Sequence, residues 1–498
     1  MSSVKQEMIH GVFWSAIERY SGIIVSLIVS AVLARLITPK DFGTVAVVTV
    51  IINFFSIFAT MGIFPAIIQR NDLTQKNLNS IFTYSILGGG FLSLLLFCSA
   101  RKVANFYNDN SLIFICQILS VNLFFIALNM VPNALMAKNK KFRQIAQRTL
   151  FLQVFSGIIS IIAAYNGFGI YSLLIAPIVT SIGMFLFNMY YYPCRVDFTF
   201  DLSPLKKIFS YSAYQFLFEF INFFSRNTDK LIIGKFLNMS ALGYYDKSYR
   251  LMMLPLQNIT FVITPVMLPV FSVLQNDLKE LADKYCRILM LLGYISMPIS
   301  VLCFFCGKEL ILLFFGNQWE GAVIPFKILS FTIWMQILTS SSGAIFQASN
   351  NTKKMFVSGC LGASLTISSF IITLNFWGTI TSVAIGYLCA QLINTIQCFY
   401  LIFTSLKYSI RPLLNHLMIP MLISVIVFVI LLVYSSLFSF NDILIDFFAK
   451  GFFGFSLFFI LYQLFGEYDL VLLFKTKVLK RKYRICLLYT SDAADEAR

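Results

Sequence analysis

The sequence predicts an all-α protein that crosses a membrane many times. Hydrophobic residues make up 58% of the 498 residues and charged residues only 12%, whereas about a quarter of the residues in a soluble domain are charged. Apolar runs of about twenty residues, the length that spans a bilayer as a helix, recur along the chain. The chain also repeats itself at an offset of about 200 residues, which indicates two parallel six-helix repeats, and two extra C-terminal helices bring the total to about 14 transmembrane helices.

Three short motifs occur twice in the same order. The pairs are Arg35 to Gly43 with Lys235 to Gly243, Ala134 to Asn139 with Ala344 to Asn350, and Asn166 to Gly169 with Asn375 to Gly378. Because each repeat holds an even number of spans, the second repeat enters the membrane in the same orientation as the first. The two repeats are therefore expected to be related by a pseudo-two-fold axis along the membrane normal, as in transporters built from parallel repeats.

Each apolar run between polar or turn-forming residues is expected to be one span. The expected spans are 11–36, 42–68, 79–99, 112–136, 149–165, 168–193, 209–236, 242–272, 284–306, 323–346, 355–376, 379–405, 412–437 and 447–472. The fifth span is short, and the tight turn Asn166-Gly167-Phe168-Gly169 separates it from the sixth. Short loops leave no room for a soluble domain.

The spans group into five parts. These are an N-terminal six-helix lobe (1–193), a cytoplasmic linker with the start of an interfacial helix (194–208), a C-terminal six-helix lobe (209–405), an additional transmembrane pair (406–474) and a cytoplasmic tail (475–498). Residues 490–498 are acidic and rich in small side chains, unlike the basic tail before them, and are expected not to be native.

Basic residues set the expected orientation. Most of the Lys and Arg between spans fall on one side, including the stretch from Lys138 to Arg148 and the tail from Lys475 to Arg484. By the positive-inside rule this side is cytoplasmic, which places both termini inside a bacterial inner membrane. The net charge of +16 then reflects topology and contacts with anionic membrane lipids, and nucleic-acid binding is not expected.

Signals for catalysis are missing from the sequence. The two histidines, His10 and His416, have no acidic or Ser partner at a useful spacing, and no phosphate-binding Gly-rich loop with Lys is present. Most cysteines lie in apolar segments, and Cys303-x-x-Cys306 is interpreted as core packing. The sequence therefore predicts a protein that is not an enzyme and that holds no metal or organic cofactor.

Ionisable side chains inside spans are costly in a bilayer and mark a functional path by default. They concentrate in the first, seventh and eighth spans, where helical spacing places them on common faces. The expected lining of a substrate cavity is Glu18, Arg19, Glu219, Asn222, Arg226, Asp229, Lys230, Asp246, Lys247, Arg250 and Gln257.

Two structural explanations, neither of which involves a substrate, compete with that interpretation. The charges could pair internally and only pin helices together, or the Lys and Arg could lie at span ends and extend to the head groups. For Lys230, Lys235 and Lys247 these alternatives are about as strong as cavity lining. Cavity lining is favoured for Arg226 with Asp229 and for Glu18 with Arg19. Two amide stripes carry less weight, because hydrogen bonds between helices explain them equally well. The stripes are Asn122, Asn129 and Asn133, and Gln391, Asn394 and Gln397.

Several motifs resemble a known family. They are Gly11 to Ser15, the turn from Leu33 to Gly43, Thr228 to Gly234 followed by Leu242 to Tyr245, Leu313 to Trp319, and Gln347 to Asn350. These motifs, spread over about residues 5–405, resemble the polysaccharide transporters (O-antigen repeat-unit flippases) of the multidrug/oligosaccharidyl-lipid/polysaccharide flippase superfamily. The resemblance implies two six-helix lobes whose first, second, seventh and eighth spans line a central cavity.

The resemblance also implies a function. The protein would flip undecaprenyl-diphosphate-linked oligosaccharide units across the inner membrane for surface polysaccharide synthesis, by alternating access of two lobes. Arg19, Arg226, Lys230 and Arg250 would hold the diphosphate or acidic sugars. Glu18, Glu219, Asp229 and Asp246 would balance them, and one would bind a coupling ion, H⁺ or Na⁺. A polysaccharide polymerase and glycosyltransferases are the expected protein partners.

Other functions remain open. A cation-coupled multidrug exporter of the same superfamily would favour an acidic, aromatic cavity, and here bases are at least as numerous as acids. A lipid II flippase is the nearest sibling, and sequence separates it poorly. A membrane polysaccharide polymerase would need a sizeable external loop with catalytic residues, which the short loops do not provide. A membrane scaffold without transport activity would not need charges inside its spans.

Overall fold

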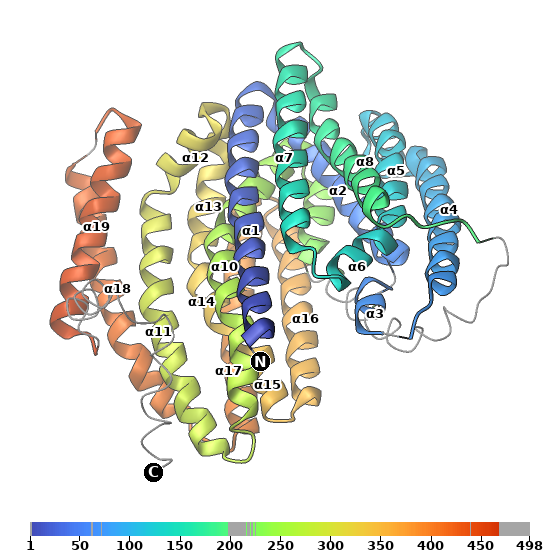
Figure 1. Cartoon of the computed structure of the whole chain (residues 1–498). Coiled ribbons are helices and arrows are strands. Elements are labelled where there is room, and N and C mark those ends of the chain that lie inside the picture. The colour runs from blue at the N-terminus through green and yellow to red at the C-terminus, as the bar shows by residue number, and fades with distance from the viewer. Residues whose placement is uncertain are drawn as a thin grey trace. The chain divides into compact units, whose positions relative to one another are not determined.

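The structure is a computed structural model of the whole chain, and it describes residues 2–60, 63–70, 72–197, 216, 220, 223–224, 226–438 and 440–467. Every regular element within these residues is a helix (Figure 1). Eleven helical segments among them are long and apolar enough to cross a membrane, and a bent pair, Asn317–Ser330 with Thr332–Ala348, makes up to 12. The predicted fold class, an all-α polytopic membrane protein, is confirmed.

Two further predicted spans need separate mention. The eighth, 242–272, coincides with α10 (Met239–Ser272), which carries the charges discussed below. The seventh, 209–236, lies mostly outside the described residues, which include a helical stretch from 226 to 236. The total of about 14 spans and their arrangement as two repeats therefore remain predictions.

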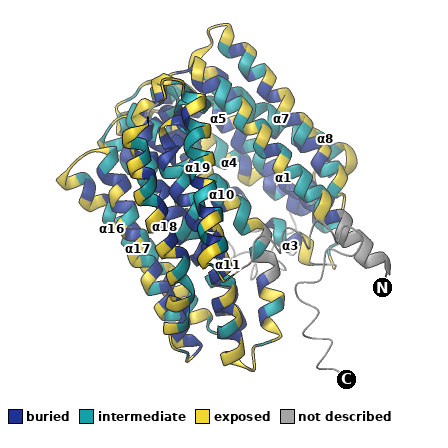
Figure 2. Ribbon diagram, turned by 90° about the vertical axis from the view of Figure 1, so that its left-hand side faces the viewer, coloured by how far each residue is buried: buried dark blue, intermediate teal, exposed yellow. Residues whose placement is uncertain are grey.

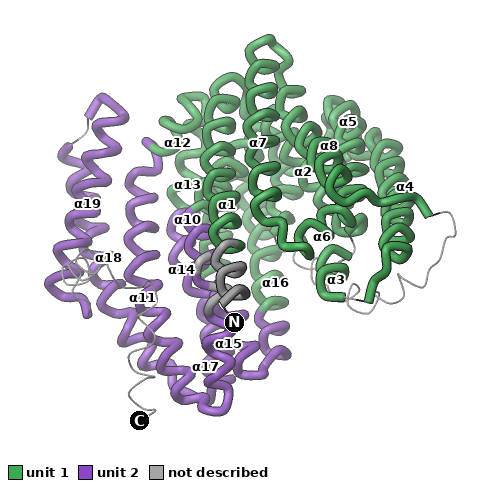
Figure 3. The backbone as a smooth tube through the Cα atoms, in the orientation of Figure 1, with its two compact units in different colours: residues 1–254, 310–329, 359–394 green, residues 255–309, 330–358, 395–498 purple. Residues whose placement is uncertain are grey.

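Contacts divide the chain into two compact units (Figure 3). Unit 1 comprises residues 1–254, 310–329 and 359–394, and unit 2 comprises residues 255–309, 330–358 and 395–498. This division does not test the predicted boundaries of the lobes, linker, additional helix pair and tail, which remain predictions.

In unit 1, pairs of neighbouring helices pack along their lengths: α4 on α5, α1 on α7, and α7 on α8. The helices of this unit's first part are α1 (Ser2–Leu36), α2 (Pro39–Thr60), α3 (Ile63–Gln69), α4 (Gln75–Tyr107), α5 (Ser111–Leu128), α6 (Met130–Lys138), α7 (Phe142–Tyr165), the short 3₁₀ helix η1 (Gly169–Tyr171) and α8 (Ser172–Tyr191). Unit 1 also contains the start of α10, most of α12 (Gly307–Phe315), η2 (Asn317–Ala322) and α13 (Val323–Ser330), and parts of α16 (Thr352–Phe376) and α17 (Ile380–Ser405).

Unit 2 is built around one long helix. This helix, α11 (Leu278–Phe305), packs on α14 (Thr332–Thr339), α18 (Arg411–Leu437) and α19 (Ile443–Phe465), and the unit also contains α15 (Ser342–Ala348). Its apolar core joins Met290 and Val301 of α11 to Val427 and Leu431 of α18 and Phe458 of α19. The two C-terminal helices are thereby packed into unit 2 by a shared core.

Local signals explain where several helices begin. Thr74 precedes α4 and its hydroxyl accepts the Asn77 N–H, Asp277 accepts the Lys279 and Glu280 N–H groups at the start of α11, and Asp442 does the same for Leu444 in α19. Such side chains satisfy the N–H groups that a helix start leaves without partners.

The outward faces of the helices are apolar. In α18, Val425, Val429 and Val433 are each more than half exposed, while Val427 and Leu431 are fully buried. Figure 2 shows such exposed residues along α16, α17 and α18. A continuous exposed apolar face on a water-soluble protein would aggregate, whereas lipid tails solvate it, so this pattern suits a membrane.

Several helices begin a few residues earlier than predicted, and α7 is the one that matters for the packing of a charge. The fifth span was expected from residue 149, after a basic stretch at the membrane surface, but α7 begins at Phe142. Arg148 consequently lies inside the bundle and is only 5% exposed. The basic residues before it delayed the predicted start, because charge alone does not show that a side chain has partners in the bundle.

Candidate functional site

The centre of the candidate site is a carboxylate that binds two cations. Asp246 on α10 lies 2.9 Å from the Lys230 ammonium and 2.7 Å from Arg250 Nε. The Asp246 and Lys230 side chains are 7% and 14% exposed, whereas that of Arg250 is 60% exposed. All three residues belong to unit 1. Charges that are withdrawn from solvent in this way are costly unless they pair, so the three side chains hold one another in place.

Aromatic rings surround this cluster. The rings of Tyr245 and Tyr249, one turn apart on α10, stack at 6.2 Å, and Tyr387 of α17 meets Tyr249 edge-on at 5.9 Å. The Lys230 ammonium lies 5.7 Å from the centre of the Tyr249 ring, within cation–π range. Phe370 of α16 stacks on Tyr387 at 6.0 Å. Four helical segments of unit 1 therefore contribute side chains to this cluster.

Of the other predicted cavity residues, Asp229 and Arg226 share the helical stretch that carries Lys230, and Gln257 belongs to unit 2. Asp229, next to Lys230, is 3% exposed, and its carboxylate accepts the Lys230 backbone N–H at 2.8 Å. Arg226 and Gln257 are exposed. Glu219 and Asn222 lie outside the described residues.

Lys247 belongs to a different environment. Its ammonium donates to the Ser30 hydroxyl at 2.6 Å and lies 4.0 Å from the centre of the Phe42 ring, with Phe315 and Trp319 at 5.0 and 5.6 Å. The residue is 4% exposed. An aromatic cage of this kind stabilises a buried cation electrostatically. For Lys247 the structure places the side chain in helix packing, which favours the alternative interpretation given above.

Around Lys247, two turns of unit 1 interlock. The first helical turns of α2 and α10 meet at Gly43 and Gly243. An added Cβ on either glycine would overlap a backbone carbonyl of the other helical turn. The indole N–H of Trp319 donates to the Ala34 carbonyl at 2.7 Å, and Arg35 donates to the Leu313 carbonyl at 2.6 Å.

Glu18 and Arg19 lie on α1, and both are half-buried. Glu18 accepts the Thr149 hydroxyl of α7 at 2.9 Å. No described ion pair links either residue to Asp246, Lys230 or Arg250. The structure therefore brings together three of the predicted residues, places Asp229 beside them, and directs Glu18 toward α7.

Sequence reasoning missed a second polar cluster in unit 1. Arg148 donates to Asn133 at 3.3 Å and also to Asn188, and Asn188 in turn donates to Asn129 at 2.6 Å. The amide stripe of α5 and α6 therefore serves hydrogen bonds between helices. The signal that could have found this network is Asn188, a polar residue in an otherwise apolar helix, which the sequence interpretation passed over.

The described residues form long apolar helices of membrane-spanning length with ion pairs among them, an architecture that fits a polytopic membrane transporter. A family model described as "polysaccharide biosynthesis protein" matches residues 32–324. The chain belongs to this family, and the predicted resemblance is confirmed.

Individual relatives agree with this assignment. The chain is 24% identical to the teichuronic acid biosynthesis protein TuaB of Bacillus subtilis, over 85% of this chain and 88% of that protein. It is 23% identical to the lipopolysaccharide biosynthesis protein WzxC of Escherichia coli, over 85% and 86%. Among solved structures it resembles the lipid II flippase MurJ in an inward closed conformation, with a TM-score of 0.71, 17% identity, and coverage of 94% and 100%.

Proposed function

We propose that this protein moves undecaprenyl-diphosphate-linked oligosaccharide units across the inner membrane for surface polysaccharide synthesis, by alternating access. Family membership supports a transporter in polysaccharide biosynthesis rather than an enzyme. The relatives are named for teichuronic acid and lipopolysaccharide biosynthesis, and the fold is shared with a lipid II flippase.

The observation that carries this proposal is the imbalance of charge around Asp246. Three cations lie here, Lys230, Arg250 and the exposed Arg226 one turn before Lys230, and two carboxylates, Asp246 and the buried Asp229, so the cations are in excess. Arg250 binds Asp246 through Nε, so its terminal Nη groups remain available on a largely exposed side chain. A diphosphate would receive bidentate, charge-assisted hydrogen bonds from such a guanidinium.

The site also answers the physical problem of the reaction. A sugar diphosphate cannot cross about 30 Å of hydrocarbon unaided, because its charges and hydroxyl groups would lose their water. Arg and Lys side chains replace that hydration, while the polyprenyl tail stays in lipid. A cationic drug would instead meet the like charges of Arg226, Lys230 and Arg250, so the multidrug exporter is the weaker candidate.

The experiment compares Arg250→Ala and Arg226→Ala in a strain that lacks its own flippase and makes surface polysaccharide only through this protein. Removing a charged hydrogen-bond partner costs about 1.5–3 kcal/mol, so we expect roughly tenfold less surface polysaccharide with Arg250→Ala at equal membrane levels of protein. Arg101→Ala is the control, because Arg101 is equally basic, exposed, and at the far end of α4. Wild-type polysaccharide in both test variants would refute the proposed role.

We propose in addition that both termini face the cytoplasm and that the protein works with a polymerase and glycosyltransferases. The distribution of Lys and Arg supports the orientation. On this orientation, the interlocked turns at Gly43 and Gly243 close the outer end of unit 1. A fluorescent protein fused to the N-terminus fluoresces only if it stays in the cytoplasm, and a dark, membrane-inserted fusion would contradict the orientation.

A coupling ion, H⁺ or Na⁺, is proposed to bind one of the carboxylates. Asp246 is already committed to two cations, and Glu18 is hydrogen bonded to Thr149. Asp229 is the best of the three, because it is buried and forms no ion pair with a described residue. Its proximity to the Lys230–Asp246 pair would link ion binding to the charge of the substrate site.

A further inference from the structure

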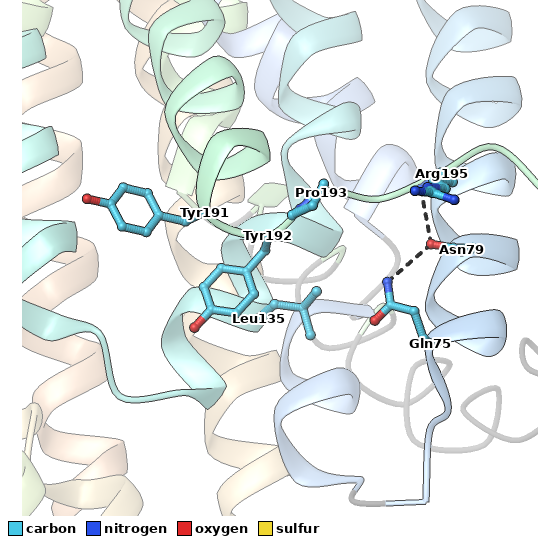
Figure 4. A pocket seen from close by; sticks show the side chains of 7 residues that line it. All are labelled: Gln75, Asn79, Leu135, Tyr191, Tyr192, Pro193 and Arg195. Atoms are coloured by element: carbon cyan, nitrogen blue, oxygen red, sulfur yellow. Dashed lines mark hydrogen bonds between the residues drawn. The ribbon is translucent and has the colours of Figure 1, made fainter.

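A pocket in unit 1 is lined by none of the residues of the charged cluster. It has a volume of about 420 Å³ and is lined by Gln75 and Asn79 of α4, Leu135 of α6, and Tyr191, Tyr192 and Arg195 at and beyond the end of α8 (Figure 4). The helix α4 begins at Gln75 and α8 ends at Tyr191, so the pocket lies where two spans end. Ends of spans lie at the level of the lipid head groups, where Tyr and Arg side chains are favoured.

The chain segment that forms one wall is pinned to α4. The Arg195 backbone N–H donates to Asn79 Oδ1 at 3.1 Å, and the Asp197 backbone N–H donates to Thr83 Oγ1 at 2.8 Å. From Arg195 to Asp197 an extended chain would advance about 6.6 Å, and from Asn79 to Thr83 the helix advances about 6 Å. The two donors are therefore spaced like the two acceptors on α4. Cys194, the residue before Arg195, is 6% exposed in the apolar core beside α4.

This anchoring leaves the Arg195 side chain free. Its backbone is fixed, yet its guanidinium forms no ion pair or side-chain hydrogen bond with any residue in the described part of the chain. Arg195 lies above Asn79 in Figure 4, and Gln75 bonds to Asn79 below it at 3.3 Å. Tyr192 and Leu135 form the opposite, more apolar wall.

We propose that this pocket binds a phosphate that carries a hydroxyl-rich head group, with the phosphate on Arg195 and the hydroxyl groups on the amides of Gln75 and Asn79. A guanidinium is the side chain best suited to a phosphate, and amides both donate to and accept from hydroxyl groups. A preorganised wall lowers the entropic cost of binding. Two sources supply this chemistry: phosphatidylglycerol in the membrane, and the glycosyl phosphate of a lipid-linked glycan.

The test measures binding to the purified full-length protein by native mass spectrometry. One arm adds phosphatidylglycerol, with phosphatidylcholine as the comparison lipid, and the other adds N-acetylglucosamine 1-phosphate. We expect the wild type to retain at least one of the two probes, and Arg195→Ala to bind it about tenfold more weakly. Retention of the lipid alone identifies a membrane-lipid site, and retention of the sugar phosphate identifies the glycan as the source.

The matched control is Arg101→Ala, which removes the same charge from an exposed position at the other end of α4. Equal binding by the Arg195→Ala and Arg101→Ala variants would overturn the proposal, as would failure of the wild type to retain either probe. Because binding is measured directly, this outcome is distinct from a loss of surface polysaccharide, which tests the proposed function at Arg250.

Discussion

Gly43 and Gly243 pack backbone against backbone, each where the other's turn leaves no space for a side chain. A Cβ on Gly43 would overlap the Met239 carbonyl oxygen, and a Cβ on Gly243 would overlap that of Pro39. The two glycines occupy matching positions in the duplicated motif, 200 residues apart. The contact is therefore reciprocal, as expected if the two turns derive from one ancestral turn.

This contact predicts the effect of adding one methyl group. Gly43→Ala or Gly243→Ala should lower the free energy of unfolding by about 1–3 kcal/mol, because backbone carbonyls cannot rotate away as a side chain can. Thermal unfolding in detergent measures the change. Gly88→Ala is the control, because nothing lies within 4 Å of the added Cβ and Ala is the better helix former. Equal melting temperatures for all three variants would show that the turns separate freely.

Removing the Asp246 carboxylate should destabilise the fold more than removing either of the cations that it binds. Asp246→Asn leaves the largely buried Lys230 without its anion, which costs about 3–5 kcal/mol. Adding Lys230→Met should recover much of this loss, since the uncompensated charge disappears. Denaturation of both variants in detergent tests the coupling. Additive losses in the double variant would contradict a direct Lys230–Asp246 interaction.

A second ion-pair cluster predicts the stability of unit 2. Lys450 on α19 lies 2.8 Å from Glu309 and 2.6 Å from Asp446, and the Glu309 side chain is only 4% exposed. Lys450→Met should cost about 3–5 kcal/mol, because two buried carboxylates lose their shared cation. Glu309→Gln should cost less, since Lys450 keeps Asp446. Lys308→Met, at an exposed neighbouring position, should unfold like the wild type. If Lys450→Met also unfolds like the wild type, the ion-pair cluster contributes nothing to the stability of unit 2.

The Arg148 network predicts a third stability effect. Arg148→Met removes the donor to Asn133 and Asn188, and buried acceptors left without a donor should lower stability by about 2–3 kcal/mol. Arg143 on the same helix is exposed over the Trp14 ring at 5.5 Å, so Arg143→Met should cost at most about 1 kcal/mol. Comparable melting temperatures for the two variants would show that burial of Arg148 does not matter for stability.

Much of the fold could be predicted from the sequence. Long apolar runs identify spans because lipid imposes a fixed length, and Asp277 and Asp442 mark helix starts through local hydrogen bonds. The site was predictable only in part. Helical spacing correctly grouped Asp246 with Arg250, one turn apart. The same spacing gave no reason to separate Lys247, because its aromatic cage comes from Phe42, Phe315 and Trp319, which are distant along the chain.

The last prediction concerns coupling through Asp229. Asp229→Asn keeps the size of the side chain and an oxygen that can accept the Lys230 N–H, but it cannot bind a proton or pair with Na⁺ as a carboxylate does. In vesicles supplied with a fluorescent lipid-linked sugar, we expect the wild type to respond to a pH or Na⁺ gradient and Asp229→Asn to respond to neither. Separate gradients identify the ion.

Two controls decide how that result is interpreted. Glu320→Gln neutralises an exposed acid of unit 1 and should leave the response to the gradient intact. Asp229→Asn should also bind the substrate as the wild type does, because Lys230 and Arg250 keep Asp246 as their partner. A wild-type gradient response in Asp229→Asn would shift the coupling role to Glu18 or Asp246. Lost substrate binding would instead mean that Asp229 positions Lys230, because the two are adjacent and hydrogen bonded through the backbone.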